Sequence, residues 1–286
     1  MRALLAEEGL APDGVLAAQH RLLTYENPYE DQPPAPSSGE GEVALFVGDA
    51  APYLWPSAVP ALLSLLQEAG IEPVLVGNGR NNGLLAHSLG YPELAKELAQ
   101  ATLDEIENSG AKTLLVLSAG DAYALGQGLQ ERLDLALPDG VELLEAGEFL
   151  LRGEHISVAG DPQGEAITAY VDPTHAVRLP DRHEWARTLA AAAAGSDLLE
   201  LFWRRDRAQP AGSTYLQFSS PEMAEKVTRA RLADAQRSGA RRLLCEDPAT
   251  LYQLSLYASD YDVEVAGLFE ELARSGYRSF SIYFPI

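Results

Sequence analysis

The sequence has one cysteine, Cys245, among its 286 residues. A disulfide within the chain is therefore excluded, and this chain alone cannot supply the several thiolates of an iron–sulfur or structural zinc site. Cys245 ends an apolar run that begins at Leu243. A cysteine at the end of a buried strand behaves as a small hydrophobe. Because no basic group is obviously placed to activate the thiol, we expect it to be buried and unreactive.

Long apolar runs are missing too. No stretch reaches the roughly 18 apolar residues of a membrane-spanning helix. The first residues lead into a segment interrupted by Glu7 and Glu8, which does not resemble a signal peptide. The sequence therefore predicts a cytoplasmic protein without direct membrane insertion.

Basic residues are scarce, with 21 Lys and Arg against 42 Asp and Glu, for a formal net charge of −21. This charge argues against a surface that binds nucleic acid or anionic membranes. The apolar share of 47% and the charged share of 22% are those of a soluble globular protein. The length suffices for two ordinary domains.

An internal repeat is the most informative positive feature. Residues 109–116 read Ser-Gly-Ala-Lys-Thr-Leu-Leu-Val, and residues 238–245 read Ser-Gly-Ala-Arg-Arg-Leu-Leu-Cys. The two copies start 129 positions apart (238 − 109). Each follows an amphipathic segment and precedes a polar turn, at 118–121 and 247–250. A repeat of this length indicates a duplicated domain.

Apolar strands alternate with amphipathic helices in both copies, which predicts an α/β fold of two pseudo-symmetric tandem domains with mainly parallel sheets. The expected organisation is a helical segment 1–30, a proline-rich linker 31–42, a first domain 43–152 and a second domain 153–286. In the first domain we expect strands 43–48, 72–76, 113–117 and 141–144, with helices 56–69 and 92–108. In the second domain we expect strands 167–171, 198–202, 241–245 and 263–265, helices 183–194, 221–238 and 249–258, and a loop 213–220.

Polar residues follow these strands. In open parallel sheets, sites gather at the carboxyl ends of strands. The polar residues at those ends are Asp49, Asn81, Asn82, Ser118, Asp121, Thr174, His175, Ser213, Asp247 and Thr250.

Three short motifs of the first domain suggest a family. The first strand ends in Phe-Val-Gly-Asp at 46–49, a loop carries Asn-Asn-Gly at 81–83, and the third strand ends in Ser-Ala-Gly-Asp at 118–121. These resemble the Phe-Val-Gly-Cys, Cys-Cys-Gly and Cys-Pro-x-Cys motifs of the cysteine-rich CCG domain pair. That pair occurs in the cysteine-rich subunit of heterodisulfide reductase, the membrane-anchor subunit of anaerobic glycerol-3-phosphate dehydrogenase, and iron–sulfur subunits of glycolate and lactate oxidation.

The second domain carries the same resemblance. Residues 170–178 read Tyr-Val-Asp-Pro-Thr-His-Ala-Val-Arg, where the family has Tyr-His-Asp-Pro-Cys-His-x-x-Arg. Residues 247–250 read Asp-Pro-Ala-Thr in place of Cys-Pro-x-Cys, and 213–215 match the second Cys-Cys-Gly loosely. The family implies electron transfer, often through an unusual iron–sulfur cluster. Every cluster cysteine is replaced here, so we expect the cluster to be lost and predict no cofactor.

The replacements in the first domain allow two interpretations. Asp49 and Asp121 could face each other across a cleft beside Asn81 and Asn82, and oxygen-rich clusters suit magnesium or calcium. We favour the structural alternative, in which these side chains fill vacated ligand positions and cap turns and helices, and we predict no metal.

The second domain offers the most catalytic-looking set, namely His175, Asp172, Arg178 and Asp247. His175 could act as a general base and Arg178 as an anion clamp. No nucleophile is evident, and the Asp-Pro step at 172 is a turn signal. We therefore favour a structural role, in which His175 and Arg178 bond backbone carbonyls or Asp247.

Together these observations predict a cysteine-depleted homologue that catalyses nothing on its own. Its expected function is that of a structural or regulatory subunit, with a protein partner in a redox complex. Two alternatives stay open. One is an enzyme that uses the interdomain cleft for a small anionic substrate, and the other is electron transfer through a cluster completed by a partner.

Overall fold

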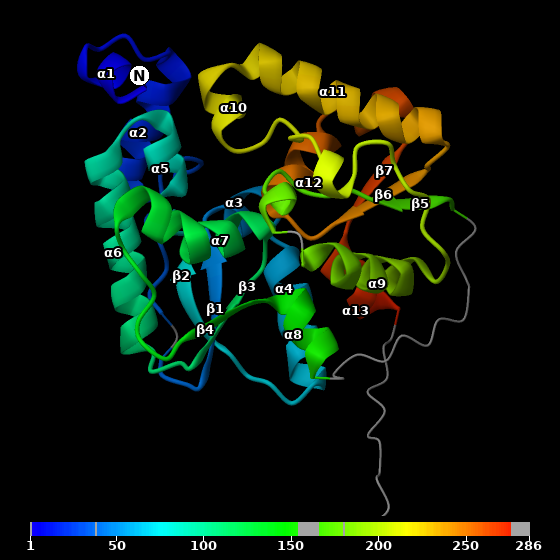
Figure 1. The fold of residues 1–286 in the computed structure, drawn as a ribbon, viewed down its shortest axis with the longest axis horizontal. Helices are drawn as coiled ribbons and strands as arrows, with labels where there is room; N and C mark the ends of the chain where they lie inside the picture. The colour runs from blue at the N-terminus through cyan, green and yellow to red at the C-terminus, as the bar shows by residue number, and fades with distance from the viewer. Residues whose placement is uncertain (1, 38, 154–165, 180, 276–286) are drawn as a thin grey trace, which may run out of the picture.

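Two parallel β-sheets organise the computed structural model, which describes residues 2–37, 39–153, 166–179 and 181–275. Figure 1 shows the two sheets in separate halves of the molecule, each flanked by helices. The first sheet has the strand order β2-β1-β3-β4, with β1 Val43–Gly48, β2 Val74–Asn78, β3 Thr113–Val116 and β4 Glu142–Glu145. The second has the order β5-β6-β7, with β5 Thr168–Tyr170, β6 Arg242–Cys245 and β7 Glu264–Gly267.

The register of the strands repeats between the sheets. Thr113 of β3 pairs with the start of β1 and with Glu142 of β4. Arg242 of β6, 129 positions later, pairs with the start of β5 and with Glu264 of β7. Ala169 of β5 forms a parallel bridge to Leu199. Leu199 therefore takes the place beside β5 that β2 takes beside β1 in the first sheet. The predicted α/β fold of two pseudo-symmetric domains with parallel sheets is confirmed.

Helices connect the strands and cover both sheets. Before the first strand lie α1 Arg2–Glu7 and α2 Asp13–Tyr25, as the sequence predicts. The first unit contains α3 Ala50–Leu54, α4 Ala58–Glu68, α5 Leu84–Leu89, α6 Pro92–Asn108, α7 Ala119–Tyr123, the π-helix η1 Ala124–Leu133 and α8 Ala146–Arg152. The second contains η2 Ala176–Arg178, α9 Arg182–Ala194, η3 Arg205–Arg207, α10 Tyr215–Ser219, α11 Pro221–Ser238, α12 Pro248–Ser255, η4 Ala258–Tyr261 and α13 Leu268–Arg274. Among the described residues, none of the helices combines the length and apolar character that a membrane span requires.

Two expectations for the second unit are wrong. The strand expected at 198–202 is reduced to the single bridge at Leu199, because the chain beyond it turns away. The backbone N–H of Trp203 donates to Asp234 at 2.9 Å, and that of Arg205 donates to Asp172 at 3.0 Å, so side chains take the place of a neighbouring strand. The loop expected at 213–220 contains α10. The segments 154–165 and 276–286 of the expected second domain lie outside the described residues.

The two units share one hydrophobic core. A single cluster of buried side chains joins Leu45 and Leu115 of the first sheet to Tyr170 and Leu244 of the second. In that junction α4 packs against α13, and α8 packs against α9. The opposite face of the first sheet forms a separate cluster with α2 and α6. The shared core fixes how the carboxyl ends of the two sheets face each other.

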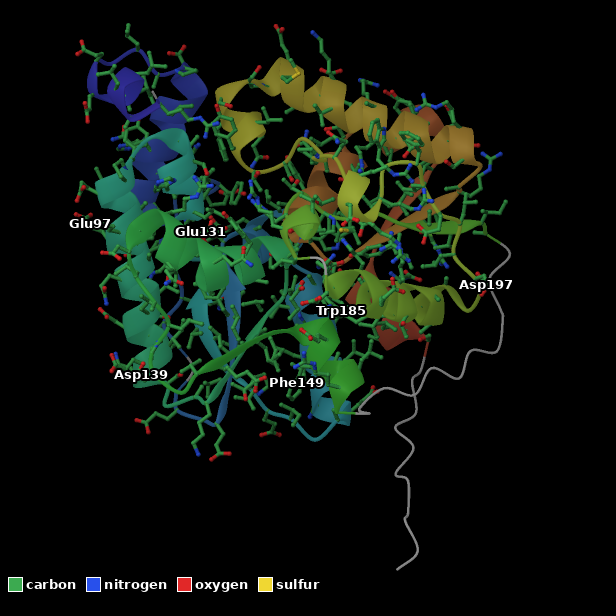
Figure 2. The ribbon with its side chains drawn as sticks, in the orientation of Figure 1. Glu97, Glu131, Asp139, Phe149, Trp185 and Asp197 are labelled. Atoms are coloured by element: carbon green, nitrogen blue, oxygen red, sulfur yellow. The ribbon has the colours of Figure 1, made fainter. Side chains whose placement is uncertain are left out.

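Close approach at the junction requires a glycine. Figure 2 shows Trp185 on α9 at the junction with α8. A Cβ added at Gly147 of α8 would lie 2.4 Å from Cζ3 of Trp185, closer than carbon atoms can pack. The guanidinium carbon of Arg182 lies 4.9 Å from the centre of the Trp185 ring. Trp185 therefore fills the space between the units and shields the Arg182 side chain from solvent.

An ion network joins the units beneath this tryptophan. The Arg182 side chain is buried, and its Nε lies 3.2 Å from both carboxylate oxygens of Glu145, which ends β4 in the first unit. Its Nη1 donates to the Tyr170 hydroxyl at 2.9 Å, and its Nη2 pairs with Glu246 of the second unit. The Tyr170 hydroxyl donates to Glu246 at 2.8 Å. One guanidinium thus bonds two buried carboxyl groups from different units.

We predict that Arg182→Ala lowers the free energy of unfolding by about 3–5 kcal/mol, because removal of one partner leaves buried carboxylates uncompensated. Arg152→Ala is the matched control. Arg152 pairs with Glu148 on the surface, and an exposed pair contributes less than about 1 kcal/mol. Urea unfolding of both variants checks the difference, and equal losses would contradict the inferred role of Arg182.

Candidate functional site

A cavity of about 440 Å³ lies between the two units. Its wall is built from residues that follow β1, β2 and β3 of the first unit and β5 and β6 of the second. Carboxyl ends of parallel strands meet at one edge of each sheet, and here the two edges face each other. The predicted residues on this wall are Asp49, Asn81, Asn82, Ser118, Asp121, Thr174, His175, Arg178, Ser213 and Asp247.

Equivalent residues cap equivalent helices in the two units. Ser118 precedes α7, and its hydroxyl accepts a hydrogen bond from the backbone N–H of Asp121 at 3.1 Å. Asp247 stands 129 positions later, precedes α12 and accepts from the backbone N–H of Thr250 at 2.7 Å. A side-chain oxygen before a helix satisfies one of its free N–H groups. Both residues therefore act as helix caps.

Amide–carboxylate pairs occupy the first-unit wall. Asn81 donates to Asp49 at 2.7 Å, and Asn82 donates to Asp121 at 2.8 Å. The Ser118 hydroxyl donates to the other oxygen of Asp121 at 2.8 Å. The side-chain oxygens of both asparagines accept from the backbone at the start of α5 at 3.0 Å. The motif positions of the first unit thus form one hydrogen-bonded layer.

The second-unit wall carries hydroxyl groups, an imidazole and a guanidinium. The Thr174 and Ser213 hydroxyls lie 3.2 Å apart. The His175 ring stacks on Tyr123 of α7, with ring centres 5.5 Å apart and planes inclined by 10°. The Arg178 guanidinium lies 5.1 Å from the centre of the same Tyr123 ring. Thr250 is fully buried and does not line the cavity.

Burial changes the acidity of the cavity groups. It raises the pKa of Asp49 to about 6. It raises the pKa of Asp121 to about 7, with further contributions from the negative charges of Asp49 and Asp247. It lowers the pKa of His175, which favours the neutral imidazole. The cavity therefore holds carboxyl groups that exchange protons close to neutral pH.

The sequence groups Asp172 with His175 and Arg178 as candidate site residues, but in the structure His175 and Arg178 line the cavity and Asp172 does not. The Asp172 side chain is fully buried and accepts from Nη2 of Arg187 at 2.8 Å. Burial alone would raise the pKa of Asp172, but the Arg187 guanidinium overcomes this and holds that pKa below its ordinary value. Asp172 therefore supports the fold behind the cavity. The hydrogen bonds expected from His175 and Arg178 to Asp247 are replaced by the contacts of both side chains with Tyr123.

Sequence reasoning missed the residues that complete the wall. Tyr29 lines the cavity, and burial followed by the charge of Asp49 raises its pKa well above the ordinary value. Arg2 of α1 donates to the Ser88 carbonyl at 2.9 Å and lies over the Tyr215 ring at 4.1 Å. Tyr215 belongs to α10, in the segment expected to be a loop. Arg2 and Tyr215 lie on helices that do not directly follow a strand. The position after a strand, which predicted the other wall residues, therefore could not identify them.

Cys245 lies in the core, as the sequence predicts. It is 1% exposed, and burial raises the pKa of its thiol well above the ordinary value. Its sulfur accepts a hydrogen bond from the backbone N–H of Asp247 at 3.4 Å. Among the described residues, no three acidic, histidine or cysteine side chains are arranged to hold one metal ion.

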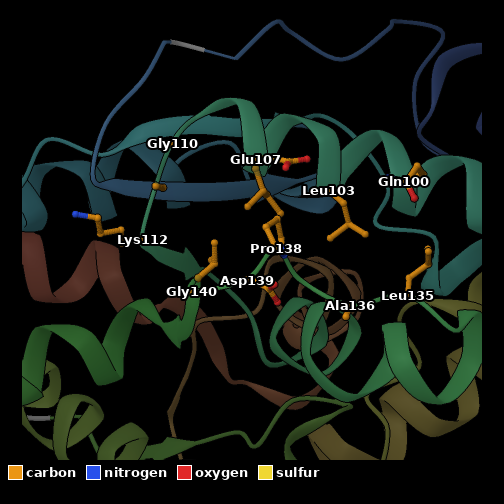
Figure 3. Close-up of a pocket in the computed structure, with 13 residues that line it drawn as sticks. Gln100, Leu103, Glu107, Gly110, Lys112, Leu135, Ala136, Pro138, Asp139 and Gly140 are labelled. Atoms are coloured by element: carbon orange, nitrogen blue, oxygen red, sulfur yellow. The ribbon is translucent and has the colours of Figure 1, made fainter.

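A second hollow of about 520 Å³ lies at the opposite edge of the first sheet. Figure 3 shows Leu103 and Glu107 of α6 on one side and Leu135, Pro138 and Asp139 of the segment before β4 on the other. Its lining lacks the converging polar pairs of the interdomain cavity, and it lies at the amino ends of β3 and β4. We therefore take the interdomain cavity as the candidate site.

Comparisons with known proteins bear on the fold alone. No protein-family model matches the sequence, and no curated protein matches it. A hypothetical protein from Helicobacter pylori is similar in structure, with a TM-score of 0.56 and 12% identity over 90% of this chain. This chain spans about half of that protein, 53% of its length. An aspartate racemase homologue from Pyrococcus horikoshii and a putative Asp/Glu racemase from Yersinia pestis each have a TM-score of 0.33 and 12% identity. Each comparison covers 82% of this chain, and 96% and 97% of those chains.

We predict that Asp121→Asn raises the melting temperature at about pH 8 and raises it by a clearly smaller amount at about pH 5. The folded protein keeps a proton on Asp121 up to about pH 7, whereas the unfolded chain releases it near the ordinary value of 3.8. The stability contributed by this proton is therefore lost as the pH rises between these values. Thermal unfolding at both pH values measures the effect.

The control is Asp139→Asn, which alters an exposed carboxylate outside the cavity. Its melting temperature should follow that of the wild type at both pH values. Identical pH dependence of the wild type and Asp121→Asn would show that Asp121 does not carry the proton.

Proposed function

We propose that this chain is a cluster-free, non-catalytic subunit of a heterodisulfide-reductase-like redox complex, and that its interdomain cavity binds a small polar ligand. One observation carries the proposal. Apart from the buried Thr250, the positions that match cluster cysteines in the two units line a single cavity, and they carry oxygen and nitrogen side chains instead of thiols. This arrangement supports the proposal, because the cavity presents hydrogen-bonding groups where the family would place cluster ligands.

The hydrogen-bonded layer supports this proposal. Asp49 is bonded to Asn81, and Asp121 is bonded to Asn82 and Ser118. Iron–sulfur clusters are held by thiolates, and these oxygen and amide groups are poor substitutes. The thiol of Cys245 is buried in the second-unit core. A structural or regulatory role is therefore favoured over electron transfer by this chain.

Exposed leucines on the N-terminal helices support a protein partner. Apolar side chains gathered on a surface segment often mark contacts with other proteins. The exposed fractions are 58% for Leu4, 42% for Leu5, 67% for Leu10 and 63% for Leu23. All four lie on or between α1 and α2, so the N-terminal segment is the proposed contact with the complex.

A second candidate is an enzyme acting on a small anionic substrate in the same cavity. It is favoured by the pKa of Asp121 near 7 and by the neutral His175 across the cavity, since general acid–base catalysis uses groups with such values. Arg178 would then clamp the substrate's anion. Turnover of a small carboxylate by the isolated protein, abolished by Asp121→Asn, would favour this candidate.

We predict that protein reconstituted anaerobically with iron and sulfide is colourless and holds substoichiometric iron after desalting. The physical reason is the lack of thiolates at the cavity. Visible absorption and iron analysis measure the outcome, with Cys245→Ser as the control that removes the buried thiol. Stable thiolate-to-iron charge-transfer absorption that persists in Cys245→Ser would contradict the proposal that the chain holds no cluster. A cluster that forms only after addition of a partner would support the electron-transfer alternative.

We predict that affinity purification from the native cell at low salt recovers this chain with subunits that carry iron–sulfur or flavin absorption. The double variant Leu4→Ser, Leu10→Ser should lose that absorption while it keeps its own melting temperature, because both side chains are exposed. Recovery of the chain without any redox-active subunit would contradict the assignment to a redox complex.

A further inference from the structure

We propose that residues 214–220, which include α10, form a lid that opens and closes over the interdomain cavity and controls access to it. This inference concerns the regulation of the site and rests on the proposed ligand-binding function. Thr214, Tyr215 and Leu216 line the cavity. From there α10 extends to α2 and to α5 of the first unit and packs against both (Figure 1). The lid therefore reaches from the second unit to the side of the cavity that α5 lines with Leu84 and Leu85.

Both ends of the lid are fixed to the long helix α11. Before the lid, Gly212 has a φ of 93°, and a Cβ there would lie 2.5 Å from both the Ala224 carbonyl oxygen and Oγ1 of Thr228 in α11. The Thr228 hydroxyl also lies 2.8 Å from the Ala211 carbonyl oxygen. After the lid, Pro221 begins α11. The segment between these two points can therefore move while its ends stay in place.

The backbone at the first residue of the lid is strained. Thr214 has a φ of 62° and a ψ of −123°. This is the conformation of the first central residue in a type II′ turn, where glycine is the usual residue. A β-branched residue rarely adopts it, and the Thr214 hydroxyl gives no compensating bond as a cap of α10. The strain is released when the lid leaves its closed position, so it favours opening.

The closed lid is held by few contacts. None of the five residues of α10 is buried, whereas α11 buries one of its faces. The Phe218 ring lies 6.0 Å from the Tyr29 ring, and Gln217 donates to the Tyr29 hydroxyl over a long 3.4 Å. Among the described residues, the Ser219 hydroxyl is buried and has no hydrogen-bond partner, which is unfavourable. A short helix with such contacts opens locally at a low free energy.

Hydrogen exchange of the full chain, without any ligand, measures the opening of the lid. In the wild type we expect the amides of residues 215–220 to exchange faster than those of α11. Thr214→Gly should slow exchange in the lid by about threefold or more, because glycine adopts the closed conformation without strain. Thr214→Ala is the matched control. It also removes the hydroxyl but keeps the Cβ that causes the strain, so exchange in the lid should stay close to that of the wild type.

A second substitution tests the same equilibrium at the other end of the lid. Ser219→Ala removes the buried hydroxyl that has no partner in the closed lid and that water can solvate in the open one. We expect it to slow exchange in the lid by about fivefold or more. Ser255→Ala is the control, because its hydroxyl is exposed at the end of α12 and bonds the Tyr252 carbonyl. It should leave exchange in the lid unchanged.

Thiol labelling links the opening of the lid to access. Ala249 lines the cavity from α12 and is 5% exposed. In Ala249→Cys, a thiol reagent added to the full chain should reach the introduced thiol when the lid opens. The rate of labelling should fall in Ala249→Cys, Thr214→Gly by the same factor as exchange in the lid. The wild type gives the baseline, because its Cys245 is buried in the core.

Equal exchange of the lid and α11 in the wild type, or the same effect of Thr214→Gly and Thr214→Ala, would overturn the lid. Labelling at position 249 that Thr214→Gly leaves unchanged would overturn its control of access. Neither measurement uses a ligand, so the failure of the ligand-binding function is seen separately. That function fails if millimolar acetate, inorganic phosphate and ethylamine all leave the melting temperature of the wild type unchanged.

Discussion

The buried Arg182 guanidinium is the constraint on which the candidate site depends. It contacts Glu145 of the first unit together with Tyr170 and Glu246 of the second. Glu246 immediately precedes Asp247, so the anchored residue and a cavity residue are neighbours in the chain. A buried ion pair contributes little net stability when compared with apolar packing, but its geometry is demanding. Here the Arg182 network orients the two units, because it holds the strand ends of the first sheet against those of the second at the cavity.

The duplication explains why the cavity has two unlike walls. The same turn after β3 and β6 caps a helix in each unit, with Ser118 in one and Asp247 in the other. In the first-unit turn, Asn82 and Ser118 donate to the carboxylate of Asp121, whereas in the second-unit turn the Asp247 carboxylate accepts from the backbone N–H of Thr250. Symmetric backbones therefore carry different side chains on the two walls of the cavity.

Periodicity predicted the fold well because buried parallel strands read as continuous apolar runs, and the helix at 92–108 has the bounds expected from its sequence. Strand-end position likewise predicted most of the wall, including Asp49 and Asp121. The sequence could not place Asp172, because its partner Arg187 lies on a helix that packs back only in the folded chain. It also could not show Tyr29 in the cavity, since long-range packing brings the N-terminal segment there. A local sequence pattern predicts helices and strands, whereas the partner of a side chain depends on which segments pack together in the folded chain.

Burying carboxyl groups without cations beside them is unfavourable for a fold. Asp49 and Asp121 have raised pKa values because water is withdrawn and no arginine or lysine of the described chain compensates them. Asp172 differs, because the Arg187 guanidinium holds its pKa below the ordinary value. An arginine neighbour does not always have this effect, because burial keeps the pKa of Glu145 raised to about 7 although Arg182 bonds it. The depth of burial and the number of donors together therefore set the acidity of each carboxyl group.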